Sequence, residues 1–229
     1  SLDSVDGTKK AKFEEWLYQV RPITAARPQS ELVAAAAQCD VVYISEKFSS
    51  SDLNTKLKTA AVGIVSEEGY LNDEFGLAST DGPAFSGSQI AITDNTHYIT
   101  SAFSVGSLQL ITSGSQDLRS ISGTLAPDLQ LLARKTGSGT QPGTLAVIGF
   151  GGKLNGSGTA AGRRVILPWG DNGFDFNKLT GNGLTLTRRA IDWAARKYVV
   201  ASVGITLRIG SDSSAAMQTA TEIRSKPCA

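Results

Sequence analysis

The chain has 229 residues, of which 41% are hydrophobic and 19% charged, a composition that excludes a largely disordered protein. Its 22 Lys and Arg residues against 21 Asp and Glu residues give a net charge of +1, which excludes the strongly basic surface typical of nucleic-acid-binding proteins. No apolar stretch has the length of a transmembrane helix, so we expect no membrane span.

The first residue and the rarer residue types suggest where the protein works. The chain begins with Ser1 rather than Met, and it holds 24 Gly, one Met and one His. We interpret it as a processed, exported chain that is secreted or held at the cell surface. The two cysteines, Cys39 and Cys228, can form a disulfide in an oxidising compartment, and two unpaired thiols are the equal alternative.

The first 75 residues alternate between helical and strand patterns. Apolar spacing and good helix formers predict helices over residues 8–19, 29–38 and 51–59. Strands are predicted over residues 22–24, 40–46 and 61–65, and the last two have the β-branched, apolar character of strands buried on both faces. This alternation predicts right-handed crossovers and a parallel sheet with helices on both faces.

The middle of the chain changes to short β-rich runs separated by Gly, Ser, Asp and Pro. These runs cover residues 89–93, 108–112, 118–122, 129–135 and 144–150. We expect them to form an antiparallel β extension of the sheet. A buried strand over residues 164–169 and an amphipathic helix over residues 184–198 then close a single predicted domain, residues 1–198.

The two ends of the chain suggest a rearranged sheet. The chain opens on a helix, although α/β domains of this kind usually open on their central strand. In the remaining segment, residues 199–229, apolar residues alternate with small or polar ones at Val203, Ile205, Leu207 and Ile209. We expect this strand to fill the place of the missing first strand, either in its own subunit or in a neighbouring one. The other interpretation is that a first strand was removed with an upstream segment.

Three stretches of the chain carry a family pattern. They are residues 39–77 (CDVVYISEKFSSSDLNTKLKTAAVGIVSEEGYLNDEFGL), 92–103 (ITDNTHYITSAF) and 162–196 (GRRVILPWGDNGFDFNKLTGNGLTLTRRAIDWAAR). In this order they resemble the class I glutamine amidotransferase-like superfamily, and more closely its trehalose-utilisation-protein-like branch. The resemblance implies a flavodoxin-like, Rossmann-like fold, which is a doubly wound, mostly parallel sheet.

The resemblance also implies an active site that this chain departs from. Active members carry a cysteine on the turn from a strand to the core helix, and a His-Glu pair downstream. Here the turn reads SEEG over residues 66–69, and Cys39 and Cys228 lie elsewhere. The only histidine, His97, is not followed by a glutamate two residues on. Because a Cys-His relay needs both groups within hydrogen-bond reach, we expect a pseudoenzyme without amidotransferase chemistry.

Acidic residues nevertheless gather at the predicted carboxyl ends of strands, where α/β folds bind ligands. They are Glu46, Glu67, Glu68, Asp73 and Glu74. Paired carboxylates there can bind a divalent metal or act on a sugar, with His97 as a titrating partner. The commoner role is to cap helices by accepting backbone N–H bonds. A nucleophilic Ser66 is disfavoured, because the G-x-S-x-G setting is absent and neighbouring carboxylates raise the pKa of a hydroxyl.

Two other stretches begin a ligand-binding pattern without completing it. Residues 169–177 (WGDNGFDFN) place Asp171 and Asp175 as weak candidate metal ligands, but the stretch lacks the closing glutamate of a calcium loop, and a turn is favoured. The glycine-rich residues 148–162 match no phosphate-binding loop and precede a strand, so a hairpin loop is favoured there. We therefore predict no cofactor.

Two functions follow from these observations. The first is a non-catalytic structural or binding module that assembles with itself, as a homo-oligomer or a filament, through the strand over residues 203–209. The alternative is a carbohydrate-binding or carbohydrate-processing domain in which Glu67, Glu68 and His97 face the ligand. Neither hypothesis involves nucleic acid or a membrane span.

Overall fold

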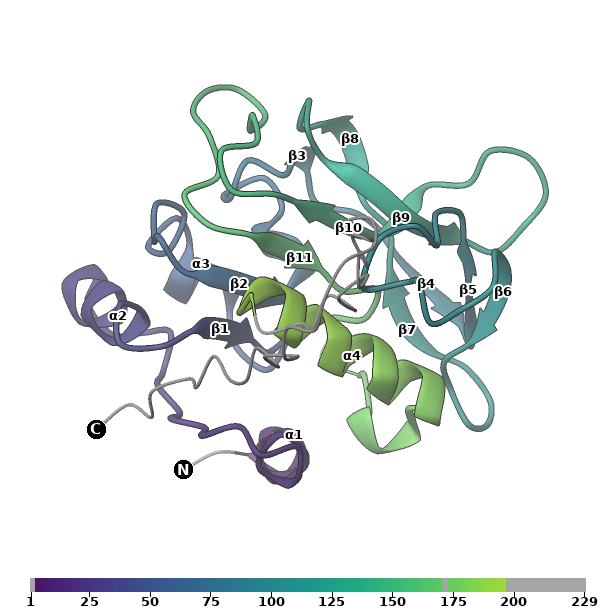
Figure 1. The fold of residues 1–229 in the computed structure, drawn as a ribbon, viewed down its shortest axis with the longest axis horizontal. Helices are drawn as coiled ribbons and strands as arrows, with labels where there is room; N and C mark the ends of the chain where they lie inside the picture. Colours follow the sequence, from purple (N-terminus) through teal and green to yellow (C-terminus); the bar gives the residue numbers. More distant parts are fainter. Residues whose placement is uncertain (1–2, 171–172, 197–229) are drawn as a thin grey trace, which may run out of the picture. The chain divides into compact units, whose positions relative to one another are not determined.

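A mixed sheet of seven strands forms the centre of the computed structural model, which describes residues 3–170 and 173–196. The strand order is β1-β2-β11-β10-β9-β5-β6 (Figure 1). The strands are β1 (Val41–Ile44), β2 (Gly63–Ser66), β5 (Gln89–Ile92), β6 (Gly106–Gln109), β9 (Gln130–Lys135), β10 (Gly143–Ile148) and β11 (Arg164–Ile166).

The sheet has a parallel part and an antiparallel part. β1, β2 and β11 run in parallel, with Ile44 opposite Ser66 and Val65 opposite Val165. The pairs from β11 through β10, β9 and β5 to β6 are all antiparallel. Two further antiparallel pairs join β3 (Ala78–Thr80) to β8 (Ser122–Leu125) and β4 (Ala84–Gly87) to β7 (Gln116–Arg119).

Four α-helices and two short 3-10 helices accompany the strands in the described residues. They are α1 (Ser4–Glu15), α2 (Gln29–Ala36), α3 (Ser50–Leu53), α4 (Gly181–Ala194), η1 (Gly69–Leu71) and η2 (Phe176–Lys178). α4 is the longest of them, and Thr180 caps its start, with a hydroxyl that accepts a hydrogen bond from Gly183 N. No helix of the described residues is long and apolar enough to cross a membrane.

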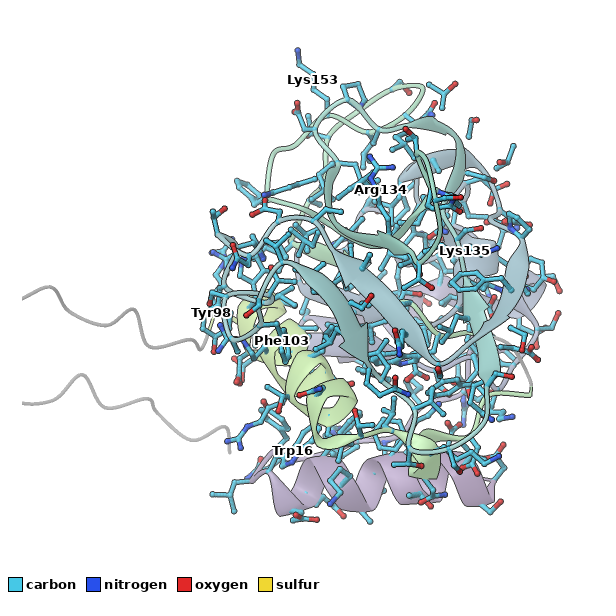
Figure 2. The ribbon with its side chains drawn as sticks, turned by 90° about the vertical axis from the view of Figure 1, so that its right-hand side faces the viewer. Trp16, Tyr98, Phe103, Arg134, Lys135 and Lys153 are labelled. Carbon is cyan, nitrogen blue, oxygen red and sulfur yellow. The ribbon has the colours of Figure 1, made fainter. Side chains whose placement is uncertain are left out.

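The core consists of two hydrophobic clusters on opposite sides of the sheet. Neighbouring residues of β2 belong to different clusters, Val65 to the first and Ile64 to the second, because successive side chains of a strand point to opposite faces. α4 and Phe13 of α1 cover the first cluster, and Trp16, which follows α1 directly, packs against it (Figure 2). Loops and the short helices α2 and α3 close the second cluster.

The predicted fold class is wrong. A flavodoxin-like, Rossmann-like sheet is mostly parallel and doubly wound, with a helix between successive parallel strands on both faces. Here most elements are strands and helices are few. The connection from β2 to β11 contains eight strands and no α-helix, and most strand pairs in the large sheet are antiparallel. The short runs of the middle region return through tight Gly- and Ser-containing turns, which favours hairpins over helical crossovers.

Three local predictions that the structure contradicts explain why the fold class was mispredicted. Residues 22–24 form no strand. The helix predicted over residues 51–59 ends at Leu53, since Asn54 has a left-handed backbone with φ +44°. The predicted core helix after β2 is replaced by η1, because Leu77 N and Ala78 N both donate to Asn72 O and fold the chain back into β3.

β1 is an edge strand of the large sheet, so no strand of the described residues fills the place of the predicted first strand. The predicted strand over residues 203–209 and its residues Val203, Ile205, Leu207 and Ile209 lie outside the described residues, and so does Cys228. That this strand replaces the missing first strand of the sheet therefore stays a prediction.

Candidate functional site

The carboxyl ends of β1 and β2 bring two of the predicted acidic residues together. Glu46 follows β1 by two residues, and Glu67 follows β2 directly. Because the strands are parallel and Ile44 pairs with Ser66, both glutamates leave the sheet at the same edge. Between them lies Lys9 of α1, a residue that the sequence analysis did not identify.

Lys9 joins the two carboxylates in a closed cluster, which we call the buried acid pair. Its Nζ donates to Glu67 Oε2 at 2.5 Å, to Glu46 Oε2, and to Ser45 Oγ at 3.0 Å. Only 3% of Lys9 and 1% of each glutamate are exposed. A buried charge is tolerated when it is paired and hydrogen-bonded, and this cluster meets that condition for its ammonium group.

Glu67 is held from its other side by aromatic residues. Tyr43 OH donates to Glu67 Oε1, and Trp169 Nε1 donates to the same oxygen at 2.9 Å. Phe13 of α1 packs edge-on against Tyr43, with ring centroids 4.8 Å apart. The carboxyl group of Glu67 therefore has partners on both oxygens and lies beneath α1.

The protonation states in this cluster follow from burial and mutual contact. Burial raises the pKa of Glu67 to about 8, and its hydrogen bond with Glu46 and the charge of Glu46 add to this, while Lys9 opposes it. The pKa of Glu46 is lowered, because the hydrogen bond from Glu67 and the charge of Lys9 outweigh burial. Burial works against the charge of Lys9, but the charges of Glu67 and Glu46 outweigh it and raise its pKa. At neutral pH the cluster thus holds one ammonium, one carboxylate and one carboxylic acid.

A carboxylic acid with a pKa near neutrality can act as a general acid, and such groups mark candidate sites. A general acid must come within hydrogen-bond reach of its substrate, however. Glu67 is 1% exposed and its partners are all side chains of the protein, so the cluster is built as a structural link between α1 and the sheet.

The sequence signal for Lys9 is its spacing from Phe13. Residues four apart lie on the same face of a helix, so Lys9 shares the face that Phe13 buries. These two are the buried residues of α1. A lysine on the apolar side of a helix indicates a buried counter-ion, but only the docking of α1 shows which carboxylates it meets.

Glu68 and Ser66 make local backbone contacts. Glu68 Oε1 accepts a hydrogen bond from Tyr70 N at 2.9 Å, so Glu68 caps η1. Ser66 Oγ donates to Glu68 O and accepts from Glu68 N, each at 3.2 Å. Ser66 is 4% exposed. These contacts are those of a tight turn stabilised by its own side chains.

The structure does not bring His97 to the acidic residues of the strand ends. His97 Nδ1 accepts from Ile99 N at 3.2 Å, and its ring meets Trp193 of α4 edge-on with centroids 4.9 Å apart. Burial lowers the pKa of His97 to about 4, and the charges that act on it are Asp94, Arg163 and Arg189. Its neighbour Tyr98 lies beside α4, where the Arg189 guanidinium stacks on the Tyr98 ring at 4.1 Å (Figure 2). A neutral imidazole in this place does not serve Glu67 or Glu68.

A second acidic group, the surface acid triad, is formed by Asp73, Glu74 and Asp81. One oxygen of each lies within 4.8 Å of the others, close enough to ligate one cation. Burial raises the pKa of Glu74 to about 7, and the hydrogen bond and charge of Asp73 contribute. Burial and Asp73 also raise the pKa of Asp81, whereas hydrogen bonds to Glu74 lower that of Asp73. Sequence reasoning missed Asp81, because it follows β3 and reaches the others only through the fold.

The remaining candidates are partly outside the described residues. Asp175 Oδ1 accepts from Asn177 N at 3.0 Å and caps η2, while Asp171 is not described. Cys39 is exposed, and its predicted disulfide partner Cys228 is not described.

A scan of the sequence against protein-family models and a search of curated proteins found no match. The amidotransferase-like resemblance therefore stays a prediction, and the fold that it implies is the one corrected above.

Proposed function

We propose that this chain is a non-catalytic structural module that assembles with copies of itself by adding a strand at the free edge of β1. The observation that carries the proposal is this edge. Two further features support it. α1 closes the crevice at the carboxyl ends of β1 and β2, and the segment that leads into α4 covers the end of the opposite edge strand, β6.

The crevice at the carboxyl ends of parallel strands is where sheets of this kind usually bind and convert ligands. In this chain α1 lies over that place and sets Lys9 between Glu46 and Glu67. The group with the pKa best suited to acid–base chemistry, Glu67, is thereby enclosed. This arrangement supports a structural role for the carboxyl groups over a catalytic one.

The backbone of β1 offers a template for another strand. Glu67 N donates to Ile44 O, so the polar groups of Ile44, and by alternation those of Val42, face β2. The N–H and C=O groups of Val41 and Tyr43 then point away from β2, and no strand of the described residues pairs with them. An unpaired edge of this kind invites pairing with a further chain.

At the opposite edge, the end of β6 and the residues that follow it pair with the segment that leads into α4. Lys178 O accepts from Thr112 N at 2.8 Å, and Thr180 N donates to Leu110 O at 2.7 Å. The Thr180 hydroxyl also donates to Gln109 O at 2.9 Å. Since proteins commonly cover sheet edges to prevent unwanted pairing, the open β1 edge is the one suited to assembly.

The chain itself carries a sequence that is predicted to form a suitable strand. α4 ends next to β2: a Cβ on Gly63 would lie 2.1 Å from Ala194 O, which explains why this position is glycine. Gly63 pairs with Val41, so α4 ends near the amino end of β1. Each copy thus has an acceptor edge and a donor sequence with apolar residues at 203, 205, 207 and 209. Donation from one copy to the next is a head-to-tail contact, which produces filaments when it does not close into a ring.

Sedimentation velocity of the full chain over a range of concentrations tests the proposal. We expect particles larger than the 24.0 kDa single chain that grow with concentration. Ile205→Asp should abolish them, because a charge on the apolar face opposes burial against the sheet. Thr206→Asp is the matched control: it adds the same charge at the neighbouring position, on the opposite face of the strand, and should leave assembly in place.

A variant on the acceptor side completes the test. Val41→Pro removes the outward N–H of β1 at the first position of an edge strand, where proline is tolerated. It should prevent assembly while the thermal unfolding midpoint stays close to that of the parent chain. A parent chain that sediments as a single copy at every concentration would contradict the proposal, and so would an Ile205→Asp chain that assembles normally.

A further inference from the structure

The buried acid pair sets a lysine amine against a carboxylic acid inside the protein. Lys9 Nζ lies 2.5 Å from Glu67 Oε2, and both residues are buried. Since Cδ of Glu67 is one C–O bond beyond this oxygen, the nitrogen and the carbon are within about 4 Å, near the 3–3.5 Å at which bound groups react. The two groups come from α1 and from the end of β2, so a bond between them would join the helix to the sheet.

Glu46 lies beside both groups and can act as their base. Its Oε2 accepts from Lys9, and its carboxyl group is hydrogen-bonded to that of Glu67. The pKa of Glu46 is lowered and that of Glu67 is raised, so at neutral pH the first is a carboxylate and the second an acid. A neighbouring base turns a lysine ammonium into a nucleophilic amine. Burial favours this proton transfer, because it leaves Lys9 and Glu46 without charge.

The other oxygen of Glu67 is placed to carry the charge that an attack on Cδ creates. Tyr43 OH and Trp169 Nε1 both donate to Oε1, the indole at 2.9 Å. Two fixed donors on one oxygen are the arrangement of an oxyanion hole, which stabilises the tetrahedral intermediate of acyl transfer. Oε2, which faces Lys9, is then the leaving oxygen.

We propose that Lys9 and Glu67 condense to an intramolecular amide, with Glu46 moving the protons. Glu46 takes one proton from the ammonium group, and the electron pair of Nζ forms the bond to Cδ. Glu46 then gives this proton to the Oε2 hydroxyl, the C–O bond breaks and water leaves. The nitrogen passes its second proton to Glu46 and keeps the third. The cluster ends as a neutral amide beside a neutral acid, so the cost of two buried charges is removed.

The reaction occurs once within one copy of the chain, so it does not depend on the assembly at the β1 edge. Its starting state is the unlinked cluster of the folded chain, and the pKa values given for the cluster are those of that state. In the linked chain Glu67 has no proton to titrate.

Two other lysine–glutamate pairs of the α1 region provide an internal control. Lys10 lies 2.6 Å from Glu14 and Lys12 lies 2.5 Å from Glu15, both at the surface. Their separations match that of Lys9 and Glu67, but water stabilises their charges and would hydrolyse an amide. These pairs should stay unlinked, which would show that enclosure and the neighbouring base are needed besides proximity.

Mass spectrometry of the full chain, denatured after incubation in the folded state at neutral pH, measures the reaction. We expect a species one water molecule lighter than the unlinked chain, which increases over several days until it predominates. A chain kept unfolded in urea should not form it, since the two groups are then apart. Trypsin does not cleave after an amidated lysine, so the peptide of residues 1–10 should be joined to that of residues 59–119, with fragment ions that place the bond at Lys9 and Glu67.

Variants assign the roles, with circular dichroism to verify that each is folded. Glu46→Gln keeps the size of the side chain and removes the base, so water loss should slow by about 100-fold or more. Lys9→Arg keeps the positive charge between the glutamates and should show no water loss. Glu14→Gln, at the surface of α1, is the matched control and should react as the parent chain does.

Three results would overturn the proposal. The first is a folded parent chain that keeps the mass of the unlinked chain throughout the incubation, a result that needs no variant. The second is a bond to the tryptic peptide of residues 13–47, which holds Glu46, in place of residues 59–119. The third is a folded Glu46→Gln chain that loses water as fast as the parent.

Discussion

The buried acid pair and the surface acid triad place similar carboxyl groups in opposite surroundings. Glu46 and Glu67 are almost completely buried and share the ammonium group of Lys9. In the triad, Asp73 is exposed, Glu74 and Asp81 are half-buried, and the basic group that acts on Asp81 is the guanidinium of Arg119. Both clusters nevertheless hold a carboxyl group whose pKa is raised to near neutrality, Glu67 in the first and Glu74 in the second.

The comparison shows that the raised pKa has the same main cause in both clusters, and that a lysine acts against it in the buried acid pair. In the buried acid pair, burial is the largest cause, and the lysine compensates only part of it. In the triad, burial is again the largest cause, and the hydrogen bond and charge of Asp73 add to it. The first arrangement connects α1 to the sheet, so it should affect folding stability, whereas the second should affect mainly local titration.

Removing the lysine should produce the largest effect. Lys9→Met leaves Glu46 and Glu67 buried without a counter-ion, which costs about 3–5 kcal/mol of unfolding free energy at pH 8. At pH 5 the loss should be smaller, because the carboxyl groups can take up protons. Urea unfolding at the two pH values measures both.

Lys10→Met is the control for this substitution. Lys10 pairs with Glu14 on the exposed side of α1 at 2.6 Å, and exposed pairs of this kind contribute about 0–1 kcal/mol. Equal losses in Lys9→Met and Lys10→Met would show that the buried acid pair is not a structural link.

Replacing Glu67 should change the dependence of stability on pH. Its pKa is raised from the ordinary 4.5 to about 8 in the folded chain, so its contribution is complete below pH 4.5 and is lost as the pH rises to 8. Over this window of about 3.5 pH units the loss can reach about 5 kcal/mol, at 1.4 kcal/mol for each pH unit. The lowered pKa of Glu46 acts below pH 4.5 and does not change this slope.

Glu67→Gln keeps an uncharged group that can accept from Trp169 and donate to Glu46, so the variant should lose less stability between pH 5 and pH 8 than the parent chain. Unfolding free energies at pH 5, 6, 7 and 8 provide the comparison. Parallel curves for the two proteins would mean that Glu67 does not titrate in this range.

The smallest effect is expected in the surface acid triad. Asp81→Asn removes a charge that contributes to the raised pKa of Glu74, so this pKa should fall toward its ordinary value. The unfolding free energy should change by less than about 1 kcal/mol. Carboxyl NMR titration of Glu74 in the two proteins measures the shift, and an unchanged pKa would show that the triad is not coupled.

The local strand patterns were readable from the sequence, but their assembly was not. β-branched runs indicated β1, β2 and β11, and the amphipathic pattern indicated α4, because these elements bury continuous apolar surface. The fold class was mispredicted because helical patterns before Ala61 suggested crossovers throughout. One backbone feature, the left-handed Asn54, ends α3 after four residues, and nothing in the pattern around it marks that position.

The candidate site was predictable only in part for the same reason. Glu46 and Glu67 could be placed together, since parallel strands end at one edge. Lys9 and Asp81 could not, because each meets its partners through contacts between elements distant in sequence. His97 was assigned to the wrong neighbours, as its loop packs on α4 rather than at the strand ends.

The account rests on Glu67 being enclosed beneath α1 in its protonated form at neutral pH. A ¹³C NMR titration of the Glu67 carboxyl carbon in the parent chain measures this state directly. We predict a midpoint near 8, in keeping with its raised pKa. A midpoint near the ordinary value of 4.5 would place the carboxyl group in contact with water and contradict the account.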